Sequence, residues 1–495
     1  MALNLLRESR LFASTVGIYV NDDQAGGAVT HTTSNTWEIP VLSGFSFSQA
    51  TENQEVTLSE AGVAPLRGKK VFNTQLNPVE FSFTTYIRPF KDSNDTNKHK
   101  CVEAVLWEGL VGGGPVGTNA VPGATKFVVD FENSNVNQLM NLYLFFEFEN
   151  TTYFIEKACL NTAEVDFSID GIAQISWSGY GSILKDVTSM RGTSQIPQYS
   201  NLSTFKKAPT ATGKPSAFIV NKYSTLDIKD KKMSGATHGT ATVTFSPALV
   251  GTAAHGLSTG SYGLNINIDG AGASVVSIPV VSGGTIDDII NAINGTIDNA
   301  NAVLNSQGKI VFTSWAAGTT SSIALPTPVD TELLYELNAN VAPSVTAVTG
   351  TGTPKIYSVN LTGGSLSIDN GISYLTPEEL GVLNSPIGYF TSTRNISGNI
   401  TAYLNTGTAT SSAILTDMLT NSNVITHEFE ITVAVGGKSN TPRVEFRMPH
   451  CNLSFPSIST EDVMSLDIAF SALGQDISVN DELFVSYYGN VTEAY

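Results

Sequence analysis

Apolar and polar residues alternate along most of this chain, a pattern typical of strands with one buried face. The segment SLDIAFSA at 465–472 is an example, with Leu, Ile, Phe and Ala at every second position. Apolar residues at helical spacing occur in short stretches, at 100–110, 285–294 and 412–419. Turn signals such as Asn-Thr-Thr at 150–152 and Gly436-Gly437 separate neighbouring strands. The pattern therefore predicts a mainly β protein with few helices.

One stretch of the sequence occurs in two similar copies. Residues 41–63 read VLSGFSFSQATENQEVTLSEAGV, and residues 360–382 read NLTGGSLSIDNGISYLTPEELGV. The two segments align without a gap at an offset of 319, which relates Gly44 to Gly363. So long a period indicates a duplicated domain rather than a solenoid of short units. Further blocks match in the same order: 80–89 with 397–406, 100–110 with 412–419, 141–160 with 428–453, and 172–181 with 465–474.

A change of offset locates an insertion in the second copy. Ser14-Thr15-Val16 matches Ser224-Thr225-Leu226 at an offset of 210, whereas the later blocks begin at 319. The second copy therefore holds 109 additional residues between Leu226 and Ile356. Insertions are tolerated where a loop already faces outward. The corresponding segment of the first copy, 17–36, is polar and Gly-rich, as an exposed loop would be.

The chain is therefore predicted to contain two tandem β-sandwich or barrel domains, each with a flanking helix, and a small α+β domain inserted in the second. The predicted boundaries are 1–183 for the first domain, 184–216 for a polar linker, 217–228 with 355–495 for the second domain, and 229–354 for the insertion.

The insertion has a pattern of its own. Strands are predicted at 261–270, which ends in the turn signal Asp-Gly, and at 275–281. The segment 285–294 is predicted to be a helix capped by Thr285, because early Asp residues follow the Thr and four Ile share one face. Residues 308–326 are predicted to form a hairpin-like pair of strands.

Composition narrows the possible functions. Charged residues make up only 14% of the 495 positions, below the ~25% of typical proteins. Low charge suits surfaces that neighbouring subunits cover. The net charge of −18, from 44 acidic and 26 basic residues, argues against a nucleic-acid-binding surface, which needs clustered Lys and Arg. The densest basic run, at 229–232, itself contains Asp230.

No cofactor or metal is expected. Cys101, Cys159 and Cys451 include no CxxC pair, which favours buried free thiols over a disulfide framework or a zinc site. The first ten residues lack the apolar run of a signal peptide, and no stretch approaches the ~20 apolar residues of a membrane span. The six histidines form no HExxH motif or close pair: His31, His99, His238, His255, His427 and His450.

Two matches to catalytic or nucleotide-binding patterns do not have the required surroundings. GGGPVG at 112–117 follows a predicted helix, whereas a dinucleotide-binding loop follows a strand and opens a helix. GLSTG at 256–260, with His255 adjacent, is followed by a predicted strand, whereas a nucleophile elbow leads into a helix. Both are interpreted as turns, and the chain is not predicted to be an enzyme.

Three segments carry a resemblance to a known family. They are TWEIPVLSGFSFSQATENQEVTLSEAG at 36–62, AFIVNKYSTL at 217–226, and VNLTGGSLSIDNGISYLTPEELGVLNSPIGYFTSTRNISGNITAYL at 359–404. In these segments the chain resembles tail tube proteins of long-tailed bacteriophages. The resemblance covers most of the chain outside 229–354 and rests on its extent rather than on one motif.

The resemblance implies a β-sandwich or partial barrel whose inner sheet joins those of neighbouring subunits into the wall of a lumen. It also implies a long loop or hairpin that reaches the next ring, at about 48–76 and 367–393. Members with two copies, from non-contractile tails, form trimers with pseudo-sixfold symmetry. Candidate inter-ring residues in these loops are Glu52, Glu55, Glu60, Arg67, Glu378 and Glu379.

The implied location is the virion tail, after assembly in the host cytoplasm. The implied partners are other copies of the chain and the tail terminator, tail tip and tape measure proteins, without a membrane. DNA would pass through the lumen without specific binding. An acidic wall would repel phosphate, so acidic strand residues are candidates for the lumen face. Those at alternating positions are Glu147, Glu149, Glu428 and Glu430.

Two other function classes stay open. The protein could be a surface adhesin or glycan-binding protein with 229–354 as its head, in which Tyr262, Trp315 and Tyr335 stack on sugars. A hydrolase acting through GLSTG is the third reading. Within the tail hypothesis, an outward domain would collide with a contractile sheath, so a bare, non-contractile tail is preferred.

Overall fold

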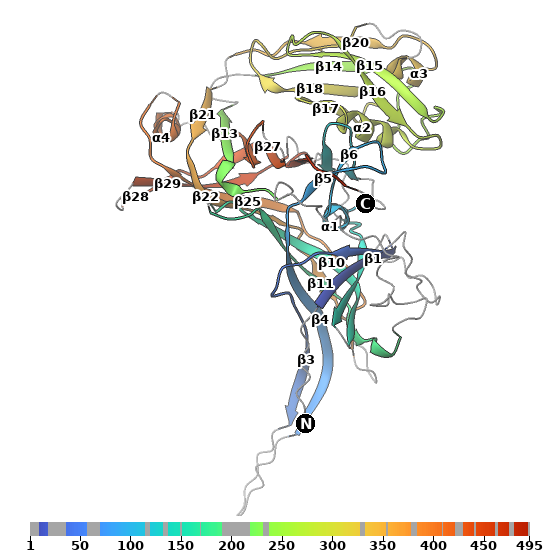
Figure 1. Ribbon diagram of the computed structural model, residues 1–495, viewed down its shortest axis with the longest axis vertical. Helices are drawn as coiled ribbons and strands as arrows, with labels where there is room; N and C mark the ends of the chain where they lie inside the picture. Colours follow the sequence, from blue (N-terminus) through green and yellow to red (C-terminus); the bar gives the residue numbers. More distant parts are fainter. Residues whose placement is uncertain are drawn as a thin grey trace, which may run out of the picture.

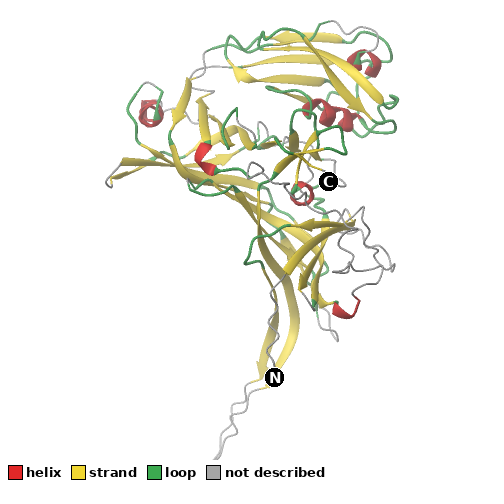
Figure 2. Cartoon of the chain, viewed as in Figure 1, coloured by secondary structure: helices red, strands yellow, loops and turns green. Residues whose placement is uncertain are grey.

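Strands dominate the computed structural model of the chain, and the helices are short (Figure 2). The prediction of a mainly β protein is confirmed. The structure describes residues 9–17, 36–56, 70–113, 119–131, 137–148, 151–168, 170–190, 218–230, 237–326, 332–352, 355–377, 384–407, 409–420, 429–439, 442–460, 464–474 and 480–493.

The elements fall into three sets along the chain. The first set is β1 (Ser9–Gly17), β2 (Thr36–Ile39), β3 (Ser46–Val56), β4 (Lys70–Tyr86), β5 (Pro89–Asp92), β6 (Lys98–Cys101), α1 (Ala104–Val111), β7 (Ala120–Val121), β8 (Phe127–Asp130), β9 (Asn141–Phe148), β10 (Thr152–Asp166), β11 (Gln174–Gly181), β12 (Ile183–Asp186) and η1 (Thr188–Met190).

The second set is interrupted by the inserted segment. It comprises η4 (Asn221–Tyr223), β13 (Thr225–Asp230), β21 (Lys355–Val359), β22 (Leu361–Asp369), β23 (Ser373–Leu375), β24 (Gly388–Phe390), β25 (Asn395–Tyr403), α4 (Ser411–Thr420), β26 (Phe429–Val435), β27 (Arg443–Leu453), β28 (Ser457–Thr460), β29 (Met464–Ala472), β30 (Phe484–Tyr488) and β31 (Thr492–Glu493).

The inserted segment forms the third set. Its elements are β14 (His238–Thr244), β15 (Gly260–Ile268), β16 (Ser274–Val280), α2 (Ile286–Asn294), β17 (Ala300–Leu304), β18 (Ile310–Ala317), β19 (Ile323–Ala324), α3 (Leu333–Leu337) and β20 (Ser344–Val348).

The first and second sets pair their strands in the same order. In the first set the order is β2-β1-β9-β10-β11-β4-β3, with every neighbour antiparallel. In the second set it is β21-β13-β26-β27-β29-β25-β22, again antiparallel throughout. A further strand is added at the same place in each, β12 on β10 and β30 on β27. One topology therefore occurs twice in the described part of the chain.

The two sets are joined into one body. The end of β10 pairs antiparallel with β22, with Val165 opposite Leu366. The late strand β30 crosses back and pairs with β8 of the first set. Behind it, the indole N–H of Trp107 donates to the hydroxyl of Tyr487 at 2.6 Å. Buried residues from both sets form one hydrophobic core.

The inserted segment has a hydrophobic core of its own, built from residues between Ala241 and Leu334. Its ends lie side by side, because Asp230 and Lys355 are paired partners of β13 and β21. The helix α2 begins as predicted, with Thr285 and Asp288 forming a reciprocal capping box. Because its two ends are adjacent, the insertion leaves the pairing of β13 with β21 intact.

One prediction within the insertion is wrong. Residues 308–326 do not form a hairpin, because β18 pairs with β14 and β17 whereas β19 pairs with β15 in another sheet. Gly318 between them takes a φ of +95°, a conformation that favours glycine. The turn there redirects the chain from one layer of the insertion to the other.

A long hairpin formed by β3 and β4 projects from the body (Figure 1). Its outer half, Thr51–Val56 paired with Lys70–Leu76, is mostly exposed to solvent. The second set has a shorter hairpin at the same place in the chain order, β23 paired with β24. The hydroxyl of Tyr374 in this hairpin donates to the Lys157 carbonyl at 2.6 Å, so the second hairpin lies against the first set.

The cysteines are buried, and the helices are short. Cys101, Cys159 and Cys451 are all buried and free of disulfides, as predicted. Burial raises the pKa of the Cys101 and Cys159 thiols, which keeps them protonated and unreactive. In the described part of the chain, no helix is long and apolar enough to cross a membrane.

Candidate assembly surface

The joined sheet runs through both sets in the order β3-β4-β11-β10-β22-β25-β29-β27. One face of it packs on the shared core, where Phe81, Trp177, Ile368, Ile400 and Phe470 are all buried. The residues between these positions point to the opposite face, because side chains alternate along a strand. We call this opposite face the open face, since its side chains are exposed or half-buried.

Short polar side chains cover the open face and contact one another across the strands. The hydroxyls of Thr84 and Ser176 lie 3.1 Å apart, and those of Thr162 and Ser178 lie 2.6 Å apart. Further along, the hydroxyl of Ser365 donates to the side-chain carbonyl of Asn399. These contacts show that the side chains share one face from β4 to β25.

The charged residues described on the open face are acidic where the strands of the joined sheet pair regularly. No Lys or Arg stands in the described stretches of these strands that form the joined sheet: Ser46–Gln49 of β3, Val79–Tyr86 of β4, Thr162–Asp166 of β10, Cys451–Leu453 of β27, and all of β11, β22, β25 and β29. A surface of hydroxyls, amides and carboxylates without a cation does not attract a polyanion. The carboxylates are Glu80, Glu164, Asp166, Asp369 and Asp467.

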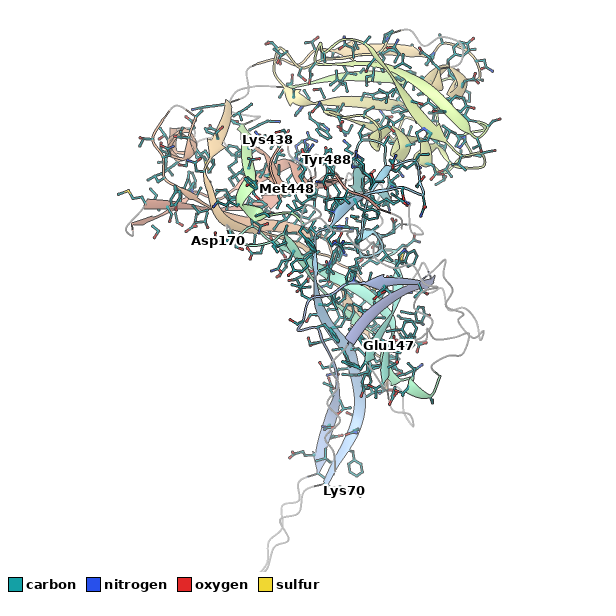
Figure 3. All side chains as sticks on the ribbon, viewed as in Figure 1. Lys70, Glu147, Asp170, Lys438, Met448 and Tyr488 are labelled. Atoms are coloured by element: carbon teal, nitrogen blue, oxygen red, sulfur yellow. The ribbon has the colours of Figure 1, made fainter. Side chains whose placement is uncertain are left out.

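Two of the four acidic residues selected from the sequence are described, and neither lies on the open face. Glu147 and Glu430 are buried inside the subunit, which corrects the expectation that they face a lumen. Their strands, β9 and β26, are central in their sheets and are covered on both faces. Figure 3 labels Glu147. Glu149 and Glu428 lie outside the described residues.

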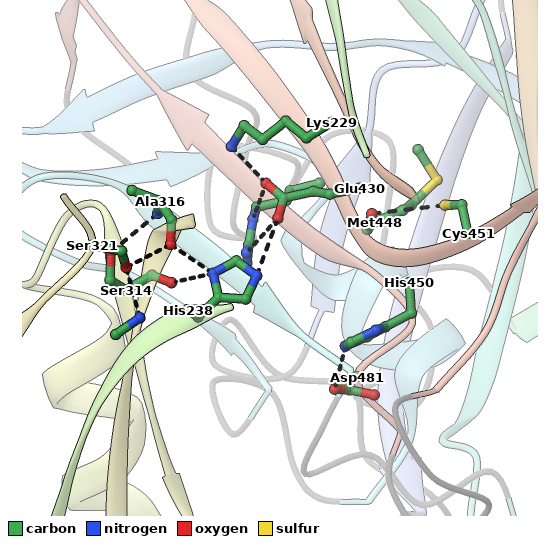
Figure 4. A network of polar contacts seen from close by, with 12 residues as sticks. Lys229, His238, Ser314, Ala316, Ser321, Glu430, Met448, His450, Cys451 and Asp481 are labelled. Carbon is green, nitrogen blue, oxygen red and sulfur yellow. Dashed lines mark hydrogen bonds and ion pairs between the residues drawn. The ribbon is translucent and has the colours of Figure 1, made fainter. Parts of the chain in front are cut away.

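Glu430 is the centre of a buried charge network (Figure 4). Its carboxylate accepts a hydrogen bond from Lys229 Nζ at 2.8 Å and two from the Arg447 guanidinium at 3.3 Å each. His238 of the inserted segment brings Nε2 to 3.9 Å from the same carboxylate. Nδ1 of that ring donates to the carbonyls of Ser314 and Ala316. The network therefore links the insertion to β26.

Aromatic stacking completes this link. The Trp315 ring lies 4.3 Å from Lys126 Nζ and 5.0 Å from Arg447 Cζ, so it is held by cations from the body. Lys126 also lies 3.7 Å from Asp298 of the insertion, and burial lowers its pKa to about 8. Trp315, a candidate sugar-stacking residue, is thus engaged in docking the insertion.

Replacing Glu430 with glutamine is expected to destabilise the subunit by about 3–5 kcal/mol, because the buried Arg447 and the half-buried Lys229 would lose their counter-charge. Urea unfolding of the full chain measures this. The matched control is Glu164→Gln on the open face, expected to change stability by less than about 0.5 kcal/mol. Equal stability of the two variants would contradict the structural role given to Glu430.

The joined sheet ends in two edges. At one end β3 pairs with β4, and in the described chain no other strand pairs with it. At the other end Asn452 and Leu453 of β27 pair with β29 alone among the described residues, and β28 likewise. Unprotected edges of this kind invite pairing with another strand.

The pairing of β10 with β22, called here the internal junction, indicates which strand each free edge could pair with. Leu453 lies opposite Phe470 as Ala163 lies opposite Trp177, so the end of β27 corresponds to the end of β10. At the 319 offset β3 corresponds to β22. The counterparts of the buried pair Val165 and Leu366 are therefore Phe455, which is 54% exposed, and the half-buried Phe47. The free edge at the end of β27 therefore resembles the β10 side of the internal junction, and the free edge at β3 resembles the β22 side.

Other candidate residues are placed as follows. Glu52 and Glu55 are exposed on the projecting hairpin. Glu60, Arg67, Glu378 and Glu379 lie outside the described residues. GLSTG is followed directly by β15, in agreement with the turn interpretation. Among described residues, no group of three or more His, Cys, Asp or Glu is placed to hold a metal.

The described part of the chain therefore combines a repeated module, an acidic open face and two free edges that match each other. No protein-family model matches the chain. It is similar to the tail tube protein pb6 of Escherichia phage T5, with 26% identity over 501 aligned residues that span 99% of this chain and 77% of that protein. The resemblance to tail tube proteins of long-tailed phages is thereby confirmed.

Proposed function

We propose that this chain is the structural subunit of a bacteriophage tail tube and resides in the virion tail. The observation that carries the proposal is the repeated strand order, joined through β10 and β22 and leaving matching edges at β3 and β27. The similarity to a tail tube protein over nearly the whole chain supports it. The two repeated sets are then two tube domains of one kind.

Ring closure follows from repeating the internal junction between chains. If β3 of one subunit pairs with the end of β27 of the next, each contact turns the chain by the same angle as the β10–β22 junction. Such heterologous contacts close into a ring when the rotation permits. Three subunits would present six equivalent β domains, and no sheet edge would stay open.

The hairpins would stack the rings. The β3–β4 hairpin extends beyond the body and has little contact with its own chain, as expected of an arm that packs on a neighbouring ring (Figure 1). The β23–β24 hairpin lies on the first set of its own chain through Tyr374 and Tyr389, whose hydroxyls donate to the carbonyls of Lys157 and Leu139. Glu52 and Glu55 are candidates for contacts made by the arm.

The open face would line the lumen. Its carboxylates would repel the phosphates of passing DNA, which would move without specific binding. The inserted domain lies on the core side of the sheet, docked through Trp315 and Glu430, and would decorate the exterior of a bare, non-contractile tail. The tail terminator, tail tip and tape measure proteins are the further partners of such a tube.

Electron microscopy of the purified protein tests the proposal. Tubes of uniform bore, built from rings with threefold symmetry and six similar inner-wall domains, are the expected result. A population that stays monomeric at high concentration, or that binds glycans through the inserted domain, would support the adhesin reading instead.

Reversing charge on the open face should slow DNA transit without blocking assembly. In phage carrying Glu164→Lys with Asp467→Lys, we expect DNA release to slow by about tenfold, because lumen lysines attract phosphate. The matched control is Glu336→Lys on α3 of the insertion, which should leave release unchanged. Release at the normal rate from double-lysine tubes would contradict the assignment of the open face.

A further inference from the structure

The segment that follows β30 packs against the small sheet of β5 and β6. Its strand β31 pairs parallel with β5, with Thr492 as the partner of Lys91, and the Lys91 N–H donates to the Val491 carbonyl at 2.7 Å. Gly489, between β30 and β31, lies so close to β5 that a Cβ there would be 2.4 Å from the carbonyl carbon of Phe90. The backbone contact therefore requires glycine and fixes the path of the segment across β5.

A side-chain hydrogen bond joins the same segment to β6. The Gly489 N–H donates to Nδ1 of His99 at 2.9 Å, and His99 is buried, with 6% of the residue exposed. A ring nitrogen accepts a hydrogen bond only while it carries no proton. The bond therefore requires a neutral imidazole with its proton on Nε2. A proton on Nδ1 would set two N–H groups against each other and break the bond.

The surroundings of His99 oppose an imidazolium. Burial, together with the nearby charges of Lys91 and Arg443, lowers the pKa of the His99 ring to about 4. The Tyr488 ring of β30 meets the imidazole edge-on, with ring centroids 6.5 Å apart. The Arg443 guanidinium lies 3.5 Å from the centre of that tyrosine ring, which keeps this cation close to the contact.

The carboxylates on the elements around His99 are placed elsewhere. Asp92 of β5 accepts a hydrogen bond from Lys100 Nζ at 2.7 Å. Asp130 of β8 lies opposite Phe484, at the other end of β30 from the His99 contact. A proton on the ring would therefore meet two cations and a backbone N–H rather than a counter-charge.

We propose that His99 is an acid-sensitive latch that holds β31 on β5. Because the pKa of His99 is lowered in the folded state, the ring binds a proton more readily once the segment has detached. The latch is therefore complete above pH 6.5, the ordinary pKa of the ring, and is lost as the pH falls toward 4. The pairing of β30 with β8 and β27 does not involve His99 and should persist in acid.

Hydrogen exchange of the full-length protein, read by mass spectrometry on peptides that cover residues 484–493, tests the latch. After correction for the intrinsic exchange rate at each pH, we expect protection of this segment to fall by about tenfold or more between pH 7.5 and pH 4.5. Peptides from β29 should keep their protection, because that strand lies in the shared core. His99→Asn offers an oxygen that accepts but cannot be protonated, so this variant should stay protected at pH 4.5.

Two further variants sharpen the test. His255→Asn is the matched control, because Nδ1 of His255 accepts from the Leu257 N–H at 2.9 Å within the inserted segment, and it should leave the acid response of β31 unchanged. Lys91→Gln removes a cation that opposes protonation, so the loss of protection should move to higher pH.

Three results would overturn the latch. They are equal protection of residues 484–493 at both pH values in the unchanged protein, an acid response retained by His99→Asn, and an unmoved midpoint in Lys91→Gln. An equal loss of protection in β29 would also overturn it, because the acid effect would then be global. Tube formation is read separately by microscopy, so none of these results bears on the proposed function.

Discussion

Subunits carrying Phe455→Asp are expected to stay monomeric under conditions in which the unchanged protein forms tubes. In the proposed ring, Phe455 packs beside Phe47 of the next subunit as Val165 packs beside Leu366 within the chain. Each Phe buried contributes about 1.5–3 kcal/mol, and the aspartate would additionally place an unpaired charge at the contact. Sedimentation velocity measures the loss of assembly.

Because Phe455 is exposed in the subunit, the variant should fold normally, with unchanged thermal unfolding of the monomer. Val275→Asp is the matched control, since Val275 is 68% exposed on the inserted segment and should not affect assembly. The same change inside the chain, Val165→Asp, should prevent stable folding instead. Tubes formed normally by Phe455→Asp would refute the proposed edge contact.

The second prediction with a large effect concerns the contact between the first and second sets of strands. Tyr487→Ala is expected to destabilise the protein by about 3–5 kcal/mol, as is typical for large buried aromatic residues. Tyr487 is fully buried on β30, accepts the Trp107 hydrogen bond at 2.6 Å and contacts the ring of Phe127. Guanidinium unfolding, followed by tryptophan fluorescence, should show a lower midpoint for the whole body.

Tyr223→Ala serves as the control, because Tyr223 is 63% exposed and its loss should change stability by less than about 0.5 kcal/mol. If Tyr487→Ala unfolded with the midpoint of the control, β30 would not hold the two halves together. Separate transitions of the first and second sets in the unchanged protein would likewise contradict their shared core.

Regular elements were predictable from the sequence where the local pattern decides the structure. Alternation located β29 and β11, and Thr285 followed by Asp288 located the start of α2. Apolar residues at helical spacing located α1 and α4. These signals depend on neighbours a few residues apart, so a single sequence contains them.

The acidic open face could also be found from the sequence, but the wrong strands were chosen. Glu147 stands in the run NLYLFFEF, whose near-continuous apolar character indicates a strand covered on both faces. Asp467, in SLDIAFSA, stands in a strand with clean alternation, and its polar positions are the ones that stay accessible. A rule that accepts acidic residues only from cleanly alternating strands selects Asp467 and Glu164 and rejects Glu147.

The pairing of strands that are far apart in the chain could not be predicted from the sequence. Nothing local states that β10 pairs with β22 or that β30 returns to β8, because these contacts depend on how the two halves meet. The hairpin predicted at 308–326 failed for the same reason, since tertiary contacts place β18 and β19 in different sheets. The network around Glu430 joins residues from three separate segments and has no local signal.

Disulfide trapping tests the central claim most directly. Ser48→Cys with Ser454→Cys places thiols at the counterparts of Ser367 and Glu164, which face each other across the internal junction. Oxidation of assembled protein should give a non-reducing ladder that ends at the covalent trimer, while Ser367→Cys with Glu164→Cys closes within one chain. A ladder continuing beyond three subunits, or no link between chains when the internal pair closes, would contradict the three-subunit ring.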